Sequence, residues 1–279
     1  MTKLHDLAYK LDAALWVKNV LGIDPAPWQW RFMSTPLGAS ILALTGRQVG
    51  KTTTAAWAMA HTASHVANSL SVVACPAQRQ SAEAVRRVKE SLIKAGVKLK
   101  NDNVYGIELE NGARVLALPG SDDSVRGLTV DGWIIADEAA RLTSDLIAAV
   151  RPMRARQPKA RLAMLSTAWS RTDPFWTAWE SDDSSWIRLK ATADVDATPF
   201  ADGFLEQERQ ALGEDDFKRE YFGVPAGSHT SPFTWEMYEQ ATHVHVPKVP
   251  PGRGFMPTEE PPVPIANPFQ NLRTAGVVR

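Results

Sequence analysis

A lysine and a threonine that directly follow a glycine are the residues best suited to chemistry in this sequence. Lys51 and Thr52 end the segment Thr45–Thr52, which lies between the apolar run Ile41–Leu44 and the helix-forming run Ala55–Ala60. A strand, a glycine turn, Lys-Thr and a helix are the layout of a phosphate-binding loop, whose backbone N–H groups attract anions. The order predicts that Lys51 reaches the β- and γ-phosphates of a nucleotide and that the Thr52 hydroxyl binds Mg²⁺. The predicted nucleotide contacts in this loop are Thr45, Gly46, Arg47, Gln48, Val49, Gly50, Lys51, Thr52 and Thr53.

The spacing of this loop departs from the usual G-x-x-x-x-G-K-[ST] pattern. Thr45 occupies the position of the first glycine, and Gly46 comes one residue late. The alternative interpretation is a glycine turn that only connects a strand to a helix. The strand–loop–helix setting favours phosphate binding, because chance matches to the motif usually lack that setting.

Two acids follow another apolar run and supply the second half of a nucleotide site. Asp137 and Glu138 come directly after Trp133–Ala136. We expect Asp137 to hold the Mg²⁺ shell, through water, and Glu138 to orient and polarise an attacking water. The alternative is a strand that ends in two solvated acids, which would also suit a helix N-terminus.

A third polar segment ends the apolar run Arg161–Leu165. Its residues are Ser166, Thr167 and Ala168. Small hydroxyl side chains at such a position can sense a γ-phosphate and pass its loss to a moving element. Taken alone, the segment is better interpreted as a strand-to-loop cap.

The elements that must position these residues alternate between strands and helices. Helical periodicity covers Leu4 to Val17, Gln78 to Ala95 and Phe200 to Phe222, and Asn111-Gly112 within Val104–Leu118 predicts a hairpin. The expected strands are residues 41–44, 70–75, 132–136, 161–165 and 186–190. This order predicts an α/β fold with a mainly parallel central sheet flanked by helices on both faces. In such sheets ligands bind at the carboxyl ends of the strands, where the polar segments lie.

Composition narrows the class of protein. The 279 residues carry a formal net charge of zero, which excludes a globally basic nucleic-acid binder but leaves a local basic surface open. Cys75 is the single cysteine, which predicts a small buried hydrophobe and no intramolecular disulfide. No apolar run reaches the length of a membrane span, so no membrane partner is expected.

The chain divides into four predicted segments. Residues 1–35 hold an N-terminal helix and an adenine-binding segment, and residues 36–195 form the phosphate-binding-loop core. Residues 196–242 form a small helical lid or linker subdomain, and residues 243–279 form a proline-rich tail that is extended or disordered.

Taken in order, the motifs resemble those of the ATPase domain of tailed-phage large terminase subunits, which package DNA. The resemblance extends from about Trp28 to Gly223 and makes the expected fold a P-loop ATPase of the ASCE class. The matching segments are Trp28-Gln29, Gly46–Thr52, Cys75–Ser81, Arg126-Gly127, Ile134–Ala140 and Leu165–Ala168.

This resemblance implies roles for single residues. Trp28 and Gln29 would form the adenine-reading motif, and Arg47 would contact the γ-phosphate. Arg126 would be an arginine finger that acts on a neighbouring subunit's ATP. The competing interpretation, that Arg126 pairs with Asp122 or Asp123, is about as good. The implied catalytic set is Lys51, Arg47, Arg126 and Glu138, with ATP and Mg²⁺ as cofactors and Thr52 and Asp137 as metal-site residues.

The function implied by the resemblance is that of an ATP-hydrolysing motor that moves double-stranded DNA into a procapsid in the host cytoplasm. Its implied partners are the portal and the small terminase subunit, in a homo-oligomeric ring when active and as a monomer in isolation. The alternatives are a helicase-like DNA translocase or remodeller, and an ATP-dependent assembly scaffold. The segment from Phe200 to Arg279 is too short for a second helicase domain, and an intact Glu138 disfavours a scaffold.

Large terminases also carry a nuclease domain whose acidic residues bind metal ions. After Glu239 this sequence has only Glu259 and Glu260, within a proline-rich stretch. We therefore expect no nuclease activity from this chain, and a separate nuclease subunit could supply it.

A basic cluster precedes the Ser166 segment and is the candidate for DNA contacts. Its members are Arg151, Arg154, Arg156, Lys159 and Arg161. Such residues could meet DNA phosphates, but charge alone favours a solvated helix end, where cations suit the helix dipole. Three nearby tryptophans are expected to pack between the sheet and the helical subdomain rather than stack on bases. They are Trp169, Trp176 and Trp179.

Overall fold

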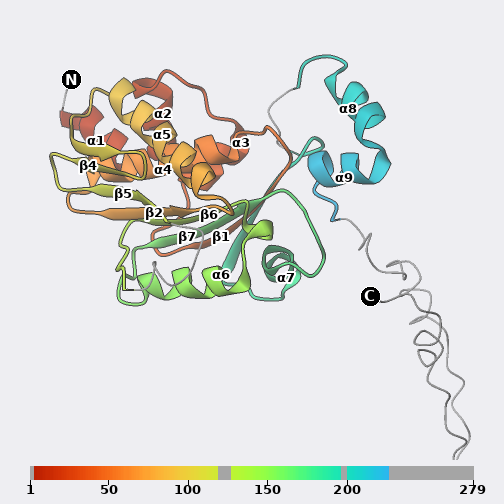
Figure 1. Ribbon diagram of the computed structural model, residues 1–279. Helices are drawn as coiled ribbons and strands as arrows, with labels where there is room; N and C mark the ends of the chain where they lie inside the picture. Colours follow the sequence, from red (N-terminus) through yellow and green to blue (C-terminus); the bar gives the residue numbers. More distant parts are fainter. Residues whose placement is uncertain (1–2, 119–126, 196–199, 226–279) are drawn as a thin grey trace, which may run out of the picture. The chain divides into compact units, whose positions relative to one another are not determined.

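An eight-stranded sheet forms the centre of the chain (Figure 1). The computed structural model describes residues 3–118, 127–195 and 200–225. The strand order is β3-β4-β5-β2-β6-β7-β1-β8. The strands are β1 (Ser40–Thr45), β2 (Leu70–Ala74), β3 (Leu99–Asn103), β4 (Gly106–Leu109), β5 (Arg114–Ala117), β6 (Trp133–Asp137), β7 (Arg161–Ser166) and β8 (Trp186–Ala191).

Six of these strands run parallel, from β5 through β2, β6, β7 and β1 to β8. Strand β7 lies between β1 and β6, with Leu165 opposite Ala43 on one side and Asp137 on the other. The phosphate-binding loop and the Asp137-Glu138 pair therefore follow strands that are separated by one further strand. This is the predicted ASCE arrangement, and the predicted mainly parallel sheet is confirmed.

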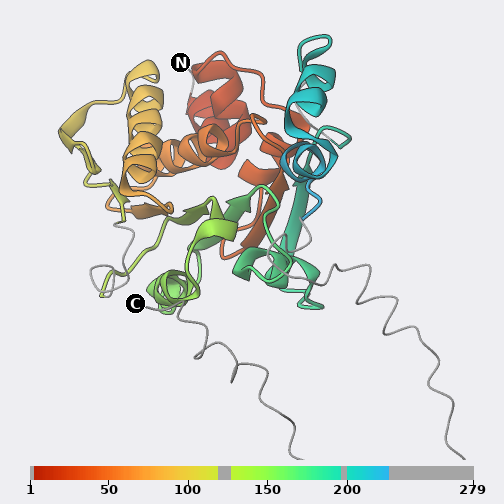
Figure 2. The ribbon, with the colours of Figure 1, turned by 45° about the vertical axis from the view of Figure 1, so that its right-hand side comes forward.

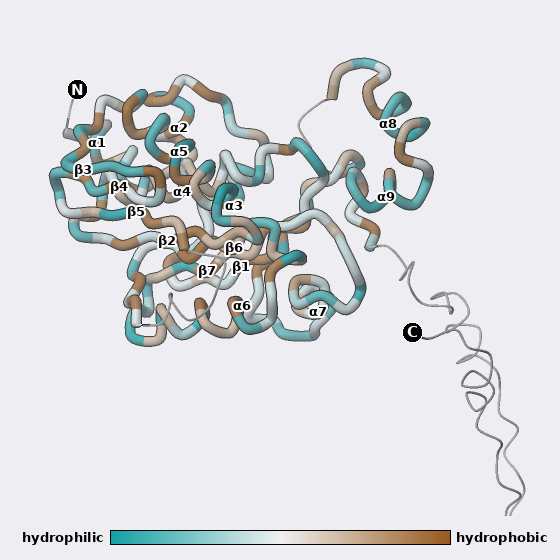
Figure 3. Tube along the Cα trace, in the orientation of Figure 1, coloured by the Kyte–Doolittle hydropathy of each residue, from teal (hydrophilic) through white to brown (hydrophobic). Residues whose placement is uncertain are grey.

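Helices cover both faces of the sheet, as Figures 1 and 2 show. The helices are α1 (Lys3–Leu11), α2 (Ala13–Val20), α3 (Pro27–Met33), α4 (Lys51–His65), α5 (Gln78–Lys94), α6 (Ser144–Val150), α7 (Pro174–Glu180), α8 (Phe204–Leu212) and α9 (Glu214–Phe222). Helices α1 to α5 lie on one face, and α6 and α7 lie on the other. The central strands are apolar along their length because both of their faces are covered (Figure 3).

Two hydrophobic cores result from this layering. On the face of α1 to α5, Phe32 stacks on Trp133 with ring centroids 5.3 Å apart. On the face of α6 and α7, Phe175 and Trp176 pack against β-strand residues such as Met164. Each core fixes one set of helices to the sheet, and together they hold the strand ends rigidly in place.

The predicted strands and helices agree with the structure except that the N-terminal helix is broken, and helices α3, α6 and α7 and strand β3 were not predicted. The N-terminal helix is broken, because Asp12 adopts an extended backbone and its carboxylate accepts the Leu15 N–H at 2.9 Å, which starts α2. Strand β3, Leu99–Asn103, was not predicted, since its polar, exposed side chains show no alternation. It pairs antiparallel with β4, and the predicted hairpin of β4 and β5 is confirmed.

Helices α8 and α9 confirm the helical pattern predicted from Phe200 to Phe222. The division into residues 1–35, 36–195 and 196–242 stays a prediction, and the tail of 243–279 lies outside the described residues. Within the part of the chain that the structure describes, no helix has the length and apolarity that a membrane span requires.

Candidate active site

The loop between β1 and α4 is shaped by two residues in the left-handed backbone region. Gln48 has a φ of 59° and Gly50 a φ of 86°. Gly50 is also the N-cap of α4, and a Cβ there would lie 2.8 Å from Nε2 of Gln29. The left-handed backbone and the nearby Gln29 amide both favour glycine at this position. The loop therefore presents Lys51 and Thr52 in the first turn of the helix, as predicted.

The unusual position of the first glycine has a packing reason. A Cβ on Gly46 would lie 2.9 Å from the carbonyl oxygen of Tyr221, and the Gly46 N–H donates to the Ala191 carbonyl at 2.7 Å. The preceding residue, Thr45, is fully buried, and its hydroxyl donates to the Ser166 carbonyl at 3.3 Å. The glycine is thus required where the loop touches α9.

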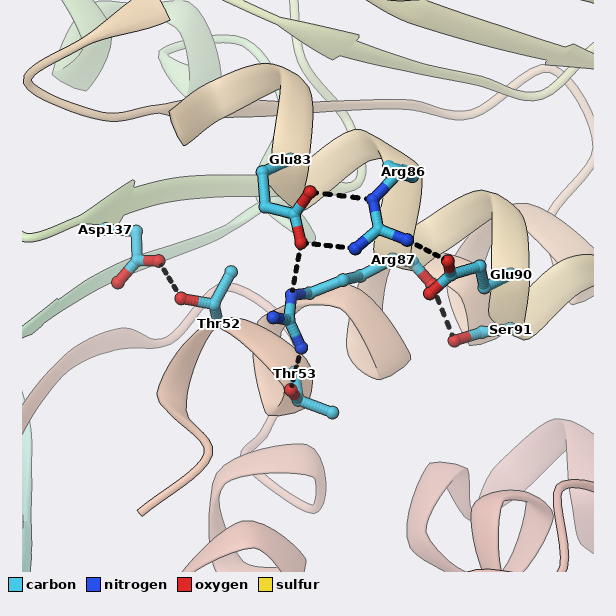
Figure 4. Close-up of polar contacts among 8 residues, drawn as sticks. All are labelled: Thr52, Thr53, Glu83, Arg86, Arg87, Glu90, Ser91 and Asp137. Carbon is cyan, nitrogen blue, oxygen red and sulfur yellow. Dashed lines mark hydrogen bonds and ion pairs between the residues drawn. The ribbon is translucent and has the colours of Figure 1, made fainter. Parts of the chain in front are cut away.

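Two polar pairs join the loop to the end of β6. Lys51 Nζ lies 2.8 Å from Glu138 Oε1, and both side chains are largely buried. The Thr52 hydroxyl donates to Asp137 Oδ2 at 2.5 Å (Figure 4). Four residues predicted from two distant motifs therefore meet at the carboxyl edge of the sheet.

Asp137 is the buried carboxylate of this group. It is 3% exposed, and burial raises the pKa of its carboxyl, while Lys51 and the Thr52 hydroxyl act in the opposite direction. A buried anion that faces a hydroxyl is a suitable donor set for Mg²⁺, which prefers oxygen ligands and completes its shell with water and phosphate. Because Asp137 and Thr52 supply only two of the oxygen ligands that Mg²⁺ needs, this arrangement suits a metal shared with phosphate and water.

Glu138 has a strained backbone. Its φ of 54° and ψ of 42° place it in the left-handed region, which a side chain of this type adopts at a cost of about 1 kcal/mol or more. The Glu138 N–H donates to Asp137 Oδ1 at 3.0 Å, which holds this conformation. Such strain is typical of functional sites, because the conformation aims the carboxylate where a relaxed backbone would not.

Ser166 connects the two halves of the site. Its hydroxyl accepts the Ala140 N–H at 3.1 Å, and its carbonyl accepts the Thr45 hydroxyl. Thr167 and Ala168 follow it and are buried. A strand-to-loop cap does not require bonds to both partners, so this geometry suits a residue that links the Asp137-Glu138 segment to the loop.

A cavity of about 820 Å³ opens from Thr52, Asp137 and Glu138 toward α5. Its size is sufficient for a nucleotide. On the α5 side, Arg87 Nη1 donates to the Thr53 hydroxyl at 3.0 Å.

A carboxylate on the same helix holds Arg87 in place. Glu83 Oε1 lies 3.3 Å from Arg87 Nε and also pairs with Arg86 (Figure 4). The Thr53 hydroxyl is therefore engaged with α5, and this contact fixes the first turn of α4 against its neighbour.

The predicted adenine motif lies at the start of α3. Gln29 is buried beside Gly50, and its Oε1 accepts the Ala26 N–H at 2.8 Å, so it caps α3. Trp28 is fully buried in the core. Gln29 therefore borders the loop, whereas the Trp28 ring has no exposed face for a base.

The predicted arginines differ in their surroundings. Arg47 has an exposed side chain, and its backbone N–H donates to the Glu220 carbonyl of α9 at 2.7 Å. Arg126, together with Asp122 and Asp123, lies outside the described residues.

Trp169 connects the loop after β7 to α9. Two guanidinium groups lie over its indole ring, Arg141 at 4.1 Å and Arg219 at 4.8 Å from the ring centroid. Trp176 and Trp179 instead belong to α7 and pack against the core on that face of the sheet. Of the three tryptophans, Trp169 thus has the predicted position against the helical segment.

The basic cluster proves to be partly structural. Arg154 donates to the carbonyls of Gly38 and Ala39 and to the Ser40 hydroxyl. Arg161 donates to the carbonyls of Thr35 and Pro36, and its guanidinium lies 4.9 Å from the Trp133 ring centroid.

The other three members of the cluster, Arg151, Arg156 and Lys159, are exposed. Arg161 begins β7, so the cluster lies at the opposite edge of the sheet from Lys51. Its predicted role in DNA contact stays a prediction.

Cys75 lies just behind the site. The thiol is 2% exposed, and burial, with the charge of Asp137, raises its pKa to about 12. Its behaviour as a small buried hydrophobe is as predicted.

Several contacts of the site could not be predicted from the sequence. Backbone carbonyls of Glu220 and Tyr221 border the loop, and Arg87 holds Thr53. The carbonyl contacts depend on how α9 packs, and no motif encodes them. The only sequence signal was the displaced Gly46, which marks a close backbone approach.

A comparison with known protein families shows which family this chain belongs to. The family model described as "Terminase large subunit, T4likevirus-type, N-terminal" matches residues 42–240, which is most of the chain. The chain belongs to this terminase family. Its members are large subunits of the terminases that package phage DNA, in agreement with the resemblance seen in the sequence.

Solved structures of phage large terminases share the fold of this terminase chain. The ATPase domain of the Thermus phage P74-26 large terminase is 17% identical, with a TM-score of 0.64, and the match covers 74% of this chain and 96% of that one. The large terminase of the thermophilic bacteriophage D6E in complex with ADP is 14% identical, with a TM-score of 0.56 over 77% of this chain. The bacteriophage HK97 large terminase is 18% identical, with a TM-score of 0.55 over 78% of this chain.

The terminase chain spans only about half the length of the D6E and HK97 proteins, 52% and 51% respectively. A search of curated proteins found no match. The matches to solved structures show that the fold is that of a terminase ATPase domain.

Proposed function

We propose that this chain binds ATP with Mg²⁺ at the carboxyl edge of its sheet and hydrolyses it as the motor domain of a phage DNA-packaging machine. The observation that carries the proposal is the meeting of Lys51 with Glu138 and of Thr52 with Asp137. The Thr52 hydroxyl and the two carboxylates line one end of a nucleotide-sized cavity, and Lys51 pairs with one of those carboxylates. Membership of the terminase family supports the same function.

In the proposed reaction, Lys51 neutralises charge on the γ-phosphate. Because Glu138 pairs with Lys51 in this structure, a γ-phosphate would compete for the ammonium group and release the carboxylate. Glu138 then accepts a proton from water as the water oxygen bonds to the γ-phosphorus. The bond from that phosphorus to the β-phosphate oxygen breaks, giving ADP and inorganic phosphate. Mg²⁺, when bound by Thr52 and Asp137, would neutralise charge on the phosphate oxygens.

Movement would arise from the contacts of Ser166 and α9. Ser166, Thr167 and Ala168 form the proposed coupling segment, because Ser166 bonds to both halves of the site. The Arg47 N–H bonds to α9, so a change in the loop on loss of phosphate would reach helices α8 and α9. Arg47 would contact the γ-phosphate through its exposed side chain.

The proposed substrate of the motor is double-stranded DNA, which it moves into a procapsid in the host cytoplasm. The proposed partners are further copies of the chain in a ring, the portal and the small terminase subunit. Family membership supports these partners in general terms.

Turnover of ATP with and without double-stranded DNA tests the function. We expect DNA to stimulate turnover, and Lys51→Ala and Glu138→Gln to lower it by about 10³-fold, since each removes a charge that acts on the transition state. Glu138→Gln should keep ATP binding, and Glu110→Gln, at an exposed position, is the matched control. Near-normal turnover in Glu138→Gln would overturn the assignment, and nucleotide binding without any turnover in the parent chain would favour the assembly scaffold.

A finer part of the proposal is that Arg126 acts on the ATP of a neighbouring copy. Arg126→Ala should then lower turnover by about 10³-fold and change ATP affinity little. Mixing Arg126→Ala with Lys51→Ala chains should restore part of the turnover, since one supplies the site and the other the finger. No recovery, with assembly confirmed by light scattering, would favour a local pair with Asp122 or Asp123.

A further inference from the structure

A second cavity, of about 610 Å³, lies at the amino-terminal ends of β6 and β7, at the opposite edge of the sheet from Lys51. The end of α1, the last turns of α4 and the segment before β1 also line it. None of its lining residues belongs to the proposed nucleotide site.

Large aliphatic side chains protrude around this cavity. Leu11, Leu37 and Val66 are 77%, 59% and 48% exposed. They come from three separate segments of the chain and gather at one opening. A contiguous exposed apolar group of this kind marks an interaction site more often than scattered surface hydrophobics do.

The charge at the same opening is positive. Lys10, Lys159 and Arg161 line the cavity, against a single acid, Asp131, while burial lowers the pKa of the neighbouring His65 and keeps it neutral at pH 7. Asp131 is already engaged, since its carboxylate accepts the Leu70 N–H at 2.7 Å. Within the described ranges neither Lys10 nor Lys159 forms an ion pair. In a chain of zero net charge, this is a local excess of cations without carboxylate partners.

We propose that this surface binds a segment of another protein in which aliphatic side chains are flanked by carboxylates. We name it the basal groove and define it by Lys10, Leu11, Leu37, His65, Val66 and Lys159. The aliphatic side chains would enter the cavity, and the carboxylates would pair with the two lysines at its rim. This binding is independent of the proposed ATPase function.

Two other occupants fit the groove less well. A small anion would occupy only part of the cavity and would leave the protruding Leu11 and Leu37 uncovered. DNA phosphates gain nothing from aliphatic groups, and the nearest arginine, Arg161, already donates to Thr35 and Pro36.

Labelled synthetic peptides of about 12 residues, titrated into the full chain, test the proposal by fluorescence anisotropy. One peptide combines Leu with Glu, the second replaces Glu by Lys, and the third replaces Leu by Ser. The Leu-Glu peptide should bind at least about tenfold more tightly than either of the others, a difference of about 1.4 kcal/mol.

Surface variants then locate the binding. Lys10→Glu and Leu37→Ser should each weaken the Leu-Glu peptide by about tenfold. Lys98→Glu and Ile93→Ser, which change an exposed lysine and an exposed aliphatic residue outside the groove, are the matched controls. Thermal melting confirms that each variant is folded, and Lys51→Ala should bind the peptide as the parent does.

Four outcomes would overturn the proposal. The first is no binding of the Leu-Glu peptide, and the second is equal binding of the Leu-Lys peptide. The third is displacement of the Leu-Glu peptide by a short DNA duplex, which would identify a nucleic-acid surface. The fourth is self-association that disappears in Leu37→Ser, which would identify an interface between copies of this chain.

Discussion

The two edges of the parallel sheet differ in the burial and pairing of their charged side chains. At the carboxyl edge, Lys51 pairs with Glu138 and Asp137 accepts from Thr52, with each group largely buried. At the amino edge, Lys10 and Lys159 are exposed beside aliphatic side chains. At the carboxyl edge a substrate phosphate must compete with Glu138 for the Lys51 ammonium group. At the amino edge the lysines are accessible to a macromolecule. One set of strands can thus support chemistry at one edge and docking at the other.

Neutralising the buried acid should have the largest effect. Asp137→Asn removes the carboxylate proposed to share Mg²⁺, so we expect turnover to fall by about 10³-fold, since a bound metal contributes several kcal/mol to the transition state. The same change removes the cost of burying a charge, so the melting temperature should rise, by about 2–4 °C for each kcal/mol gained. Asp182→Asn, at an exposed acid, should change neither quantity. A fall in both turnover and melting temperature would contradict this view of Asp137.

A pH titration of stability examines the amino edge. Burial lowers the pKa of His61 to about 4, its ring lies 4.5 Å from His65, and Asp12 and Arg161 also act on it. Because the unfolded chain binds a proton below about pH 6.5 and the folded chain does not, stability should fall as pH drops from about 6.5 to 4. The loss should reach about 3 kcal/mol.

The control for this titration is His61→Gln, which keeps a donor for the Tyr9 carbonyl but cannot titrate. Urea unfolding at several pH values should show a flatter profile for this variant. An unchanged slope would assign the acid sensitivity to other groups.

The smallest expected effect is on the free energy of unfolding when arginines of the basic cluster are replaced. Two substitutions compare an arginine that is hydrogen-bonded within the fold with one that is exposed. Arg154→Ala leaves the Gly38 and Ala39 carbonyls without this donor and should lower the free energy of unfolding by about 1–3 kcal/mol. Arg156→Ala should change it by less than about 0.5 kcal/mol.

DNA binding should show the reverse order. If Arg156 contacts phosphate, Arg156→Ala should reduce the salt slope of DNA affinity by about one. Equal effects of the two variants on DNA affinity, at unchanged stability, would contradict the structural role of Arg154.

Much of the fold was predictable because its strands are long apolar runs with polar ends. The meeting of Lys51 with Glu138 followed from the rule that parallel strands share a carboxyl edge. Strand β3 was not predictable, since an exposed edge strand needs no apolar alternation.

The contacts of α9 were also beyond prediction. The contact of α9 with Arg47 runs through a backbone carbonyl, and any residue type supplies one. The displaced glycine, Gly46, is the one sequence feature that reflects the packing of α9 against the loop. It could be interpreted only once the structure showed the Tyr221 carbonyl beside it.

The burial of Cys75 has a practical consequence for studying motion in this chain. A thiol that is 2% exposed, with its pKa raised to about 12, is a poor nucleophile at neutral pH. Cys75 should therefore not react with thiol-directed probes at neutral pH. A single cysteine placed at an exposed position of α8, such as Gln207, would accept a fluorophore selectively, without removal of the native cysteine.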